Sequence, residues 1–169
     1  MIVIRVETSE DVPAVRRVNE LAFGRPGEAD LVDALRASET PILSLVAVLD
    51  GSVAGHVLFS PVTVEPRPPG SDRCWGLGPL AVLPEYQSQG IGGQLVRAGL
   101  DACRQLGAAA VVVLGHPEYY PRFGFVPASR YGLRCEYPVP DDVFMVIELE
   151  RGSLSVPGLV RYHPAFAGV

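Results

Sequence analysis

The chain has 169 residues, of which 48% are hydrophobic and 20% charged, and its formal net charge is -5. These values are typical of a globular protein that is long enough to bury a substantial core. The negative charge argues against nonspecific nucleic-acid binding, because no basic tract is present to release phosphate counterions. All 14 basic residues are arginine, and the absence of lysine excludes a lysine Schiff base, a Walker-type lysine and acylation of an internal lysine.

The cysteines and the N-terminus indicate the compartment. Cys74, Cys103 and Cys135 lie far apart and form no Cys-x-x-Cys pair, which argues against a disulfide framework or a thiolate zinc site. Residues 1–6 are too short for a signal peptide, and no apolar run approaches the ~20 residues that cross a bilayer. We therefore expect a soluble, cytoplasmic protein with no metal site and no membrane partner.

The N-terminal part of the sequence predicts a strand, two helices and a hairpin. The expected ranges are residues 2–7 for the strand, about 10–23 (with Glu10 and Asp11 in the first turn) and 28–36 for the helices, and 43–49 and 52–59 for the hairpin strands. Thr8 or Ser9 can cap the first helix, and Gly24 begins the segment that stops it. Asp50-Gly51 between the last two ranges is a strong signal for a two-residue hairpin turn.

The C-terminal part predicts alternating strands and helices. After a proline-rich loop at residues 66–71, we expect a strand at 75–82, a helix at 92–106 with Leu106 facing inward, a strand at 109–114, a helical turn at 119–123, a strand at 144–149 and an extended tail at 153–169. Gly76, Gly78 and Pro79 interrupt the first of these strands and mark a bulge or the end of its pairing. The strand-helix-strand order over residues 75–114 is a βαβ unit, so these two strands should be parallel and adjacent. We expect one domain over residues 1–169, with a mixed sheet flanked by helices.

The most informative segment follows the strand at 75–82. The chain breaks at Pro84, passes through Gln87-Ser88-Gln89-Gly90-Ile91-Gly92-Gly93 and opens a helix. A glycine-rich loop at a helix N-terminus points several backbone N–H groups at one spot, which suits a phosphate. A Rossmann site fails because Leu95 stands at the third glycine position, and a P-loop fails because no Gly-Lys-Ser/Thr exists. The remaining alternative is that these glycines only make a tight turn.

Two motifs carry a resemblance to a known family. Residues 82–92 resemble the acyl-CoA pyrophosphate loop of the GCN5-related N-acetyltransferases (GNAT), in which Arg or Gln is followed by two residues, Gly, one residue and Gly or Ala. Tyr120-Pro121-Arg122-Phe123-Gly124-Phe125 is similar to the Tyr-x-x-x-Gly-Phe element of that family. Residues 115–125 further resemble the uncharacterised, YhbS-like bacterial branch. The likeness covers the whole chain in element order.

The resemblance implies a fold and a cosubstrate. The fold is α/β with a central mixed, mostly antiparallel sheet, in which two parallel strands splay apart and admit the pantetheine arm of acetyl-CoA. The residues that it assigns to cofactor binding are Leu80, Ala81, Val82, Gln87, Ser88, Gln89, Gly90, Ile91, Gly92 and Gly93. The phosphates would be bound mainly by backbone amides from about Gln89 to Gly93.

The resemblance also implies catalytic residues, each with a structural alternative. Tyr120 matches the proton donor to the leaving sulfur, or it packs against the cofactor. His116 stands just beyond the carboxyl end of the strand at 109–114, where ligands tend to bind, and the unperturbed pKa of histidine suits a base near neutrality. It would take the proton of the amine, or it orients the turn before Pro117; deprotonation through water without a dedicated base is the further alternative. Glu28 and Asp30 would bind a cationic acceptor, or they offset the helix dipole. His56, in mid-strand, is expected to be structural.

These observations lead to one function and one alternative. We expect acetyl transfer from acetyl-CoA to a primary amine by direct attack, because no cysteine has an adjacent base that would favour a covalent intermediate. The alternative is a catalytically weak acyl-CoA-binding module that serves as a sensor or scaffold. The identity of the acceptor and a homodimeric state stay open.

Overall fold

The computed structural model describes residues 1–66 and 73–169, so the loop predicted at 66–71 lies, apart from Pro66, outside the described residues. The chain divides into two compact units. The first comprises Met1–Phe59, Gly78–Asp101 and Pro164–Val169, and the second comprises Ser60–Leu77 and Ala102–His163. Each unit is described by itself.

The helices are α1 (Val12–Phe23), α2 (Gly27–Ala37) and α3 (Ile91–Gln105). The strands are β1 (Ile2–Val6), β2 (Leu43–Leu49), β3 (Ser52–Pro61), β4 (Thr63–Glu65), β5 (Cys74–Val82), β6 (Ala110–Leu114), β7 (Val126–Pro127), β8 (Leu133–Cys135), β9 (Phe144–Glu148) and β10 (Gly158–Arg161). Most bounds agree within two residues with those predicted.

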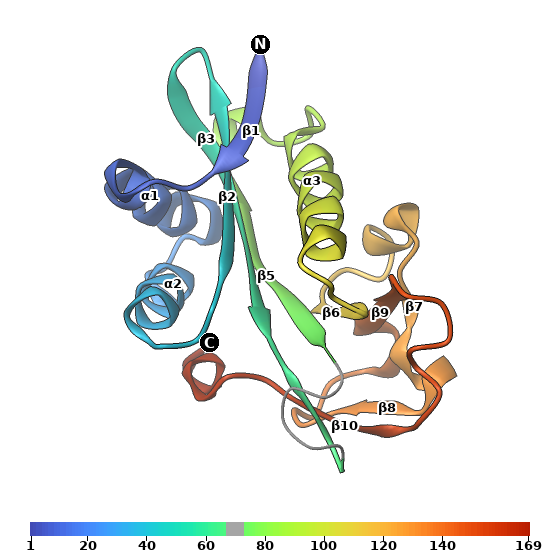
Figure 1. The fold of residues 1–169 in the computed structure, drawn as a ribbon. Coiled ribbons are helices and arrows are strands. Elements are labelled where there is room, and N and C mark those ends of the chain that lie inside the picture. The colour runs from blue at the N-terminus through green and yellow to red at the C-terminus, as the bar shows by residue number, and fades with distance from the viewer. Residues whose placement is uncertain (67–72) are drawn as a thin grey trace. The chain divides into compact units, whose positions relative to one another are not determined.

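In the first unit the strands follow the order β1-β2-β3-β5. Strands β1 and β2, and β2 and β3, are antiparallel, and the β2–β3 turn has positive φ at Asp50 (49°) and Gly51 (84°), as a tight hairpin turn requires. Helices α1 and α2 cover one face of these strands and α3 covers the other (Figure 1). Leu58 packs on the α1–α2 side, whereas the Phe59 ring lies against Gly99 of α3, as the alternation of a strand dictates.

In the second unit the strands follow the order β5-β6-β9-β7. Strand β5 is parallel to β6, with a register from Cys74↔Ala110 to Leu77↔Val113, and β6 is antiparallel to β9. The predicted βαβ unit and the mixed, mostly antiparallel sheet flanked by helices are therefore confirmed. Ala110–Val113 of β6 are fully buried, as expected for a continuous apolar strand.

Two predictions for this unit are wrong in part. The tail predicted as extended over 153–169 contains β10, which pairs parallel to β8 and antiparallel to β4 in a separate small sheet. Leu106 was expected to face inward, but α3 ends at Gln105 and the Leu106 side chain is 60% exposed. The helical pattern was extended one residue too far, into the Gly107 turn.

Candidate active site

The segment after β5 forms a helix N-terminus with free backbone amides. The first hydrogen bond of α3 runs from the Gln94 amide to the Gly90 carbonyl (3.1 Å). The amides of Ile91, Gly92 and Gly93 therefore precede the helical ladder and have no acceptor within it. Positive φ at Ser88 (64°) and Gly90 (86°) bends the loop into the helix. This arrangement can hold an anion with backbone N–H groups and the helix dipole.

Two glutamine side chains brace this loop. Gln87 Nε2 donates to the Val82 carbonyl (2.9 Å), and Gln89 Nε2 donates to the Glu85 carbonyl (3.4 Å). Both side chains are exposed. Their amides thus tie the loop back to the end of β5 and to the turn that follows it.

The β5 backbone beside this loop has one edge turned away from β3. The Leu83 amide donates to the Ala54 carbonyl of β3 (2.9 Å). Because successive residues of a strand present their N–H and C=O groups to alternate edges, Leu80 and Val82 present theirs to the opposite edge. Of the Ala81, Leu80 and Val82 side chains, only that of Ala81 is fully buried. Because the backbone N–H and C=O groups of Leu80 face the edge of β5 that is turned away from β3, they can pair with an extended ligand.

Tyr120, the predicted proton donor, is a buried residue of the second unit. It begins the 3-10 turn Tyr120–Phe123 and is only 7% exposed. Its ring meets Tyr119 edge to face at 5.1 Å and Phe125 at 5.7 Å, and it lies directly over Gly115. Burial, with a smaller effect of Tyr119, raises the pKa of the Tyr120 phenol well above its ordinary value of 10. The phenol therefore stays protonated throughout the neutral range.

His116 lies on the surface of the same unit, directly after β6. It lines a pocket of about 470 Å³ together with Pro117, Glu118, Tyr119 and Arg122. The His116 carbonyl accepts the Tyr119 amide (3.1 Å), which shapes the turn that carries Tyr120. Arg122 donates to the Tyr119 carbonyl (2.9 Å) and lies over the Tyr119 ring at 4.6 Å.

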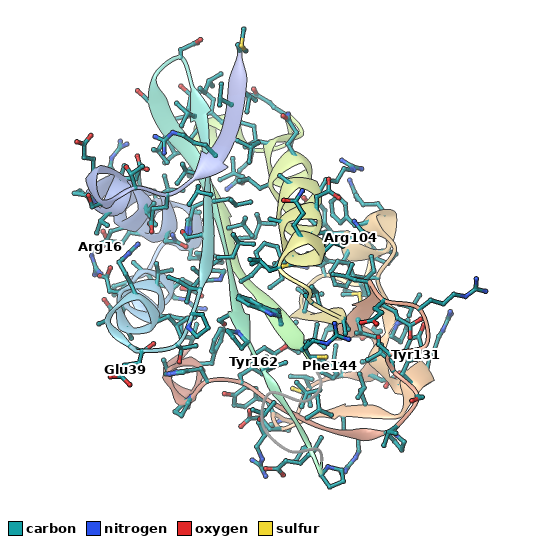
Figure 2. All side chains as sticks on the ribbon, viewed as in Figure 1. Arg16, Glu39, Arg104, Tyr131, Phe144 and Tyr162 are labelled. Atoms are coloured by element: carbon teal, nitrogen blue, oxygen red, sulfur yellow. The ribbon has the colours of Figure 1, made fainter. Side chains whose placement is uncertain are left out.

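Glu28 and Asp30 already have cationic partners within the first unit. Arg25 binds both carboxylate oxygens of the buried Glu28 at 3.0 and 2.6 Å, and this hydrogen bonding lowers the pKa of Glu28. Asp30 is exposed and accepts a hydrogen bond at 2.9 Å from Arg16. The Arg16 side chain is labelled in Figure 2. A cationic acceptor would have to replace an arginine at either carboxylate.

His56 and Cys103 have structural surroundings. His56 is fully buried, with Nδ1 3.1 Å from Asn19 Nδ2 and Nε2 2.9 Å from Ser44 Oγ, as a structural histidine should be. Asn19 Nδ2 also donates to the Val15 carbonyl (3.0 Å), so this nitrogen is the amide donor and His56 Nδ1 the acceptor. Cys103 is buried in α3, and burial raises the pKa of its thiol to about 12. A thiol of this kind is a poor nucleophile at neutral pH.

Sequence reasoning missed Gly115 as a site residue. Its importance comes from the Tyr120 ring that occupies the space of a side chain, and no local motif encodes that contact. Within residues 1–66 and 73–169 there is no cluster of three or more His, Cys, Asp or Glu that could hold a metal ion. No helix in this part of the chain is both long and apolar enough to cross a membrane.

Comparison with known proteins identifies relatives over nearly the full length. The chain is 44% identical to the uncharacterized N-acetyltransferase YhbS of Escherichia coli K12 over 166 residues, covering 96% of this chain and 97% of that protein. It is 39% identical to the uncharacterized N-acetyltransferase YjhQ of the same strain over 162 residues, covering 92% and 89%.

Solved structures give the same result. The crystal structure of E. coli YhbS in complex with CoA matches with a TM-score of 0.92 and 42% identity, covering 98% of this chain and 92% of that one. A Brucella melitensis GNAT acetyltransferase in complex with acetyl-CoA matches with a TM-score of 0.81 and 38% identity, covering 98% of both chains. The model of the acetyltransferase (GNAT) family matches residues 12–125. The chain therefore belongs to the GNAT family, and within it to the YhbS-like branch.

Proposed function

We propose that this protein transfers an acetyl group from acetyl-CoA to a primary amine by direct attack. The observation that carries the proposal is the loop of free amides at the start of α3, which fits the pyrophosphate of CoA and lies in the segment that matches the family. The CoA and acetyl-CoA complexes of the two related structures support the same cosubstrate.

The cosubstrate is assigned to the residues named above. Amides from about Gln89 to Gly93 bind the pyrophosphate, with Ser88 and the braced Gln87 shaping the loop. The outward edge of β5 at Leu80 and Val82 pairs with the two amides of the pantetheine arm, as a neighbouring strand would. These contacts use main-chain groups, so they are compatible with the partial burial of the side chains.

Tyr120 supplies the proton in this scheme. The neutral amine nitrogen attacks the thioester carbon, the tetrahedral intermediate collapses with cleavage of the C–S bond, and the phenol protonates the sulfur. Between unperturbed groups this transfer is uphill by only about 2 kcal/mol. Burial raises the pKa of Tyr120, but it also raises the pKa of a thiol released into the same dry surroundings. We therefore expect proton transfer to accompany C–S cleavage.

His116 is our candidate for the group that takes the proton of the amine. It is exposed at the carboxyl end of β6 and lines the pocket beside Tyr119, where an acceptor can reach it. Binding of a cationic acceptor by Glu28 and Asp30 stays a prediction, in competition with Arg25 and Arg16.

The test compares binding with turnover. Calorimetry measures the affinity for acetyl-CoA, and thiol release is followed with spermidine, amino-acid amides and a lysine-containing peptide. Tyr120→Phe should lower kcat at least tenfold, because general-acid catalysis is typically worth ~10²–10⁴, while the acetyl-CoA affinity stays constant. Tyr119→Phe is the matched control and should lower kcat less.

Two results would count against the proposal. Binding of acetyl-CoA without turnover of any amine would favour a sensor or scaffold. Wild-type turnover by Tyr120→Phe, with chemistry shown to limit the rate, would move the proton donor elsewhere.

A further inference from the structure

One pocket of the second unit is lined by three ionisable side chains. The pocket has a volume of about 470 Å³, and its walls are formed by His116, Pro117, Glu118, Tyr119 and Arg122. Sites for small molecules typically have volumes of about 300–1,000 Å³. Within residues 1–66 and 73–169, the His116 and Glu118 side chains make no hydrogen bond, and Glu118 and Arg122 form no ion pair. These groups are therefore available to a ligand.

The turn that carries Tyr120 also fixes the position of Arg122. Arg122 Nε donates to the Tyr119 carbonyl (2.9 Å), and the guanidinium carbon lies 4.6 Å from the centre of the Tyr119 ring. The Tyr119 amide donates in turn to the His116 carbonyl (3.1 Å). Among the described residues, the two terminal nitrogens of Arg122 have no hydrogen-bond acceptor. Because these nitrogens form a planar fork, they can bind both oxygens of a carboxylate.

The charges around the pocket are balanced. Arg122 contributes one positive charge and Glu118 one negative charge. Elsewhere in the same unit an arginine pairs directly with a carboxylate, as Arg161 does with Glu65 at 2.7 Å. A ligand that carried only an anionic group would meet the repulsion of Glu118 as well as the attraction of Arg122. The pocket therefore suits a ligand with one charge of each sign better than a simple anion.

We propose that this pocket binds a free amino acid as the acceptor of the acetyl group, and this step rests on the proposed function. The carboxylate binds the Arg122 fork, and Glu118 attracts the ammonium group, whose proton passes to His116 before the nitrogen attacks. The Tyr119 ring lines the pocket and meets the Tyr120 ring edge to face at 5.1 Å. The acceptor thus lies one aromatic ring away from the proposed proton donor.

Arg122→Gln tests the carboxylate contact. Thiol release is measured with a panel of amino acids and with the amide of each, in which a neutral group replaces the carboxylate. The preference for the acid, taken as the ratio of the two kcat/KM values, should fall by ~10- to 100-fold in Arg122→Gln, because charge-assisted hydrogen bonds are lost. Comparison of this variant with the wild type cancels the difference in amine pKa between acid and amide.

Arg130→Gln is the matched control. It removes the same charge from an exposed position of the same unit that does not line the pocket, so it should keep the wild-type preference. An unchanged preference in Arg122→Gln, or a wild type that acetylates other amines but no amino acid, overturns the proposal. It is also overturned if Arg122→Gln weakens the binding of CoA but not that of dephospho-CoA, because the fork would then hold a phosphate of the cosubstrate.

NMR titration of the same amino acids and amides without acetyl-CoA measures binding alone. If the wild type acetylates no amine, the transferase proposal fails, and the titration decides the role of the pocket. Weaker binding of amino acids to Arg122→Gln than to the wild type would then support the pocket, and an absence of binding to the wild type would overturn it.

Discussion

Gly115 should control the position of the Tyr120 phenol. A Cβ at residue 115 would lie 2.2 Å from Tyr120 Cε2 and 2.8 Å from Cδ2. Ordinary van der Waals contact begins at 3.4 Å, so in Gly115→Ala the Tyr120 ring must move away by at least about 1.2 Å, the difference between 3.4 and 2.2 Å. The neighbouring rings of Tyr119 and Phe125 resist this movement from other sides.

The expected magnitudes follow from this displacement. Overpacking of a buried site costs typically about 1–3 kcal/mol of stability, which a folded domain can lose without unfolding. Misplacement of a catalytic group by about 1 Å can cost ~10²-fold in rate. We therefore expect Gly115→Ala to fold, to bind acetyl-CoA with unchanged affinity and to lose about 10²-fold in kcat.

Urea denaturation, calorimetry with acetyl-CoA and thiol release with the best amine provide the three measurements. Gly27→Ala is the matched control, because its Cβ would meet nothing within 4 Å. In a Tyr120→Phe background, Gly115→Ala should lower kcat much less, since both changes act on the same phenol. Wild-type turnover by Gly115→Ala, or full additivity of the two changes, would refute the reasoning.

Three other predictions concern the loop and the core. Gly90→Val should weaken acetyl-CoA binding severely. Gly24→Val is its control, because φ is +69° at Gly24 and +86° at Gly90, and it should lower the stability but leave the acetyl-CoA affinity unchanged. If calorimetry gives the two variants the same acetyl-CoA affinity, the prediction is wrong. Gln87→Ala removes one exposed hydrogen bond to Val82 and should weaken binding about tenfold or less, and a loss of several orders of magnitude would mean that Gln87 itself binds phosphate. Burial, with a smaller effect of Arg36, lowers the pKa of His56 from 6.5 to about 3, so between these pH values the unfolded chain binds a proton that the folded one does not. The free energy of unfolding should therefore fall as the pH drops below 6.5, by up to about 1.4 kcal/mol per pH unit. In urea titrations at pH 7 and pH 4.5, His56→Gln should lose less stability than the wild type, and equal losses in the two proteins would refute the role of His56.

The sequence predicts those elements whose signals are local. The apolar run at residues 43–49 and the Asp50-Gly51 turn are contained in a short stretch, and the hairpin forms there. Strands β7, β8 and β10 are only two to four residues long, and prolines lie close to them, so they show no periodicity. Their pairing depends on partners far along the chain, such as Glu65 of β4 opposite Leu159 of β10.

The candidate site divides in the same way. The loop from Gln87 to Gly93 is a contiguous motif and could be identified from its glycines. Gly115 matters through the Tyr120 ring, which only folding brings to it, so the sequence holds no signal for this contact. The partner of Glu28 could have been predicted from the sequence, because Arg25 stands three residues away, at a spacing that allows an ion pair.

The first unit combines the N-terminal part of the chain with the C-terminal residues Pro164–Val169, and this has a consequence for folding during synthesis. Ala165 and Phe166 pack against its core cluster of Val15, Leu31, Val32, Leu35, Val46 and Leu58. All residues of the second unit are translated before these two, since that unit ends at His163. Ala165 and Phe166, which complete the packing of the first unit's core, are thus synthesised only after the whole second unit. We expect the nascent chain to expose this apolar surface throughout elongation, which makes it a target for chaperones until residue 166 emerges.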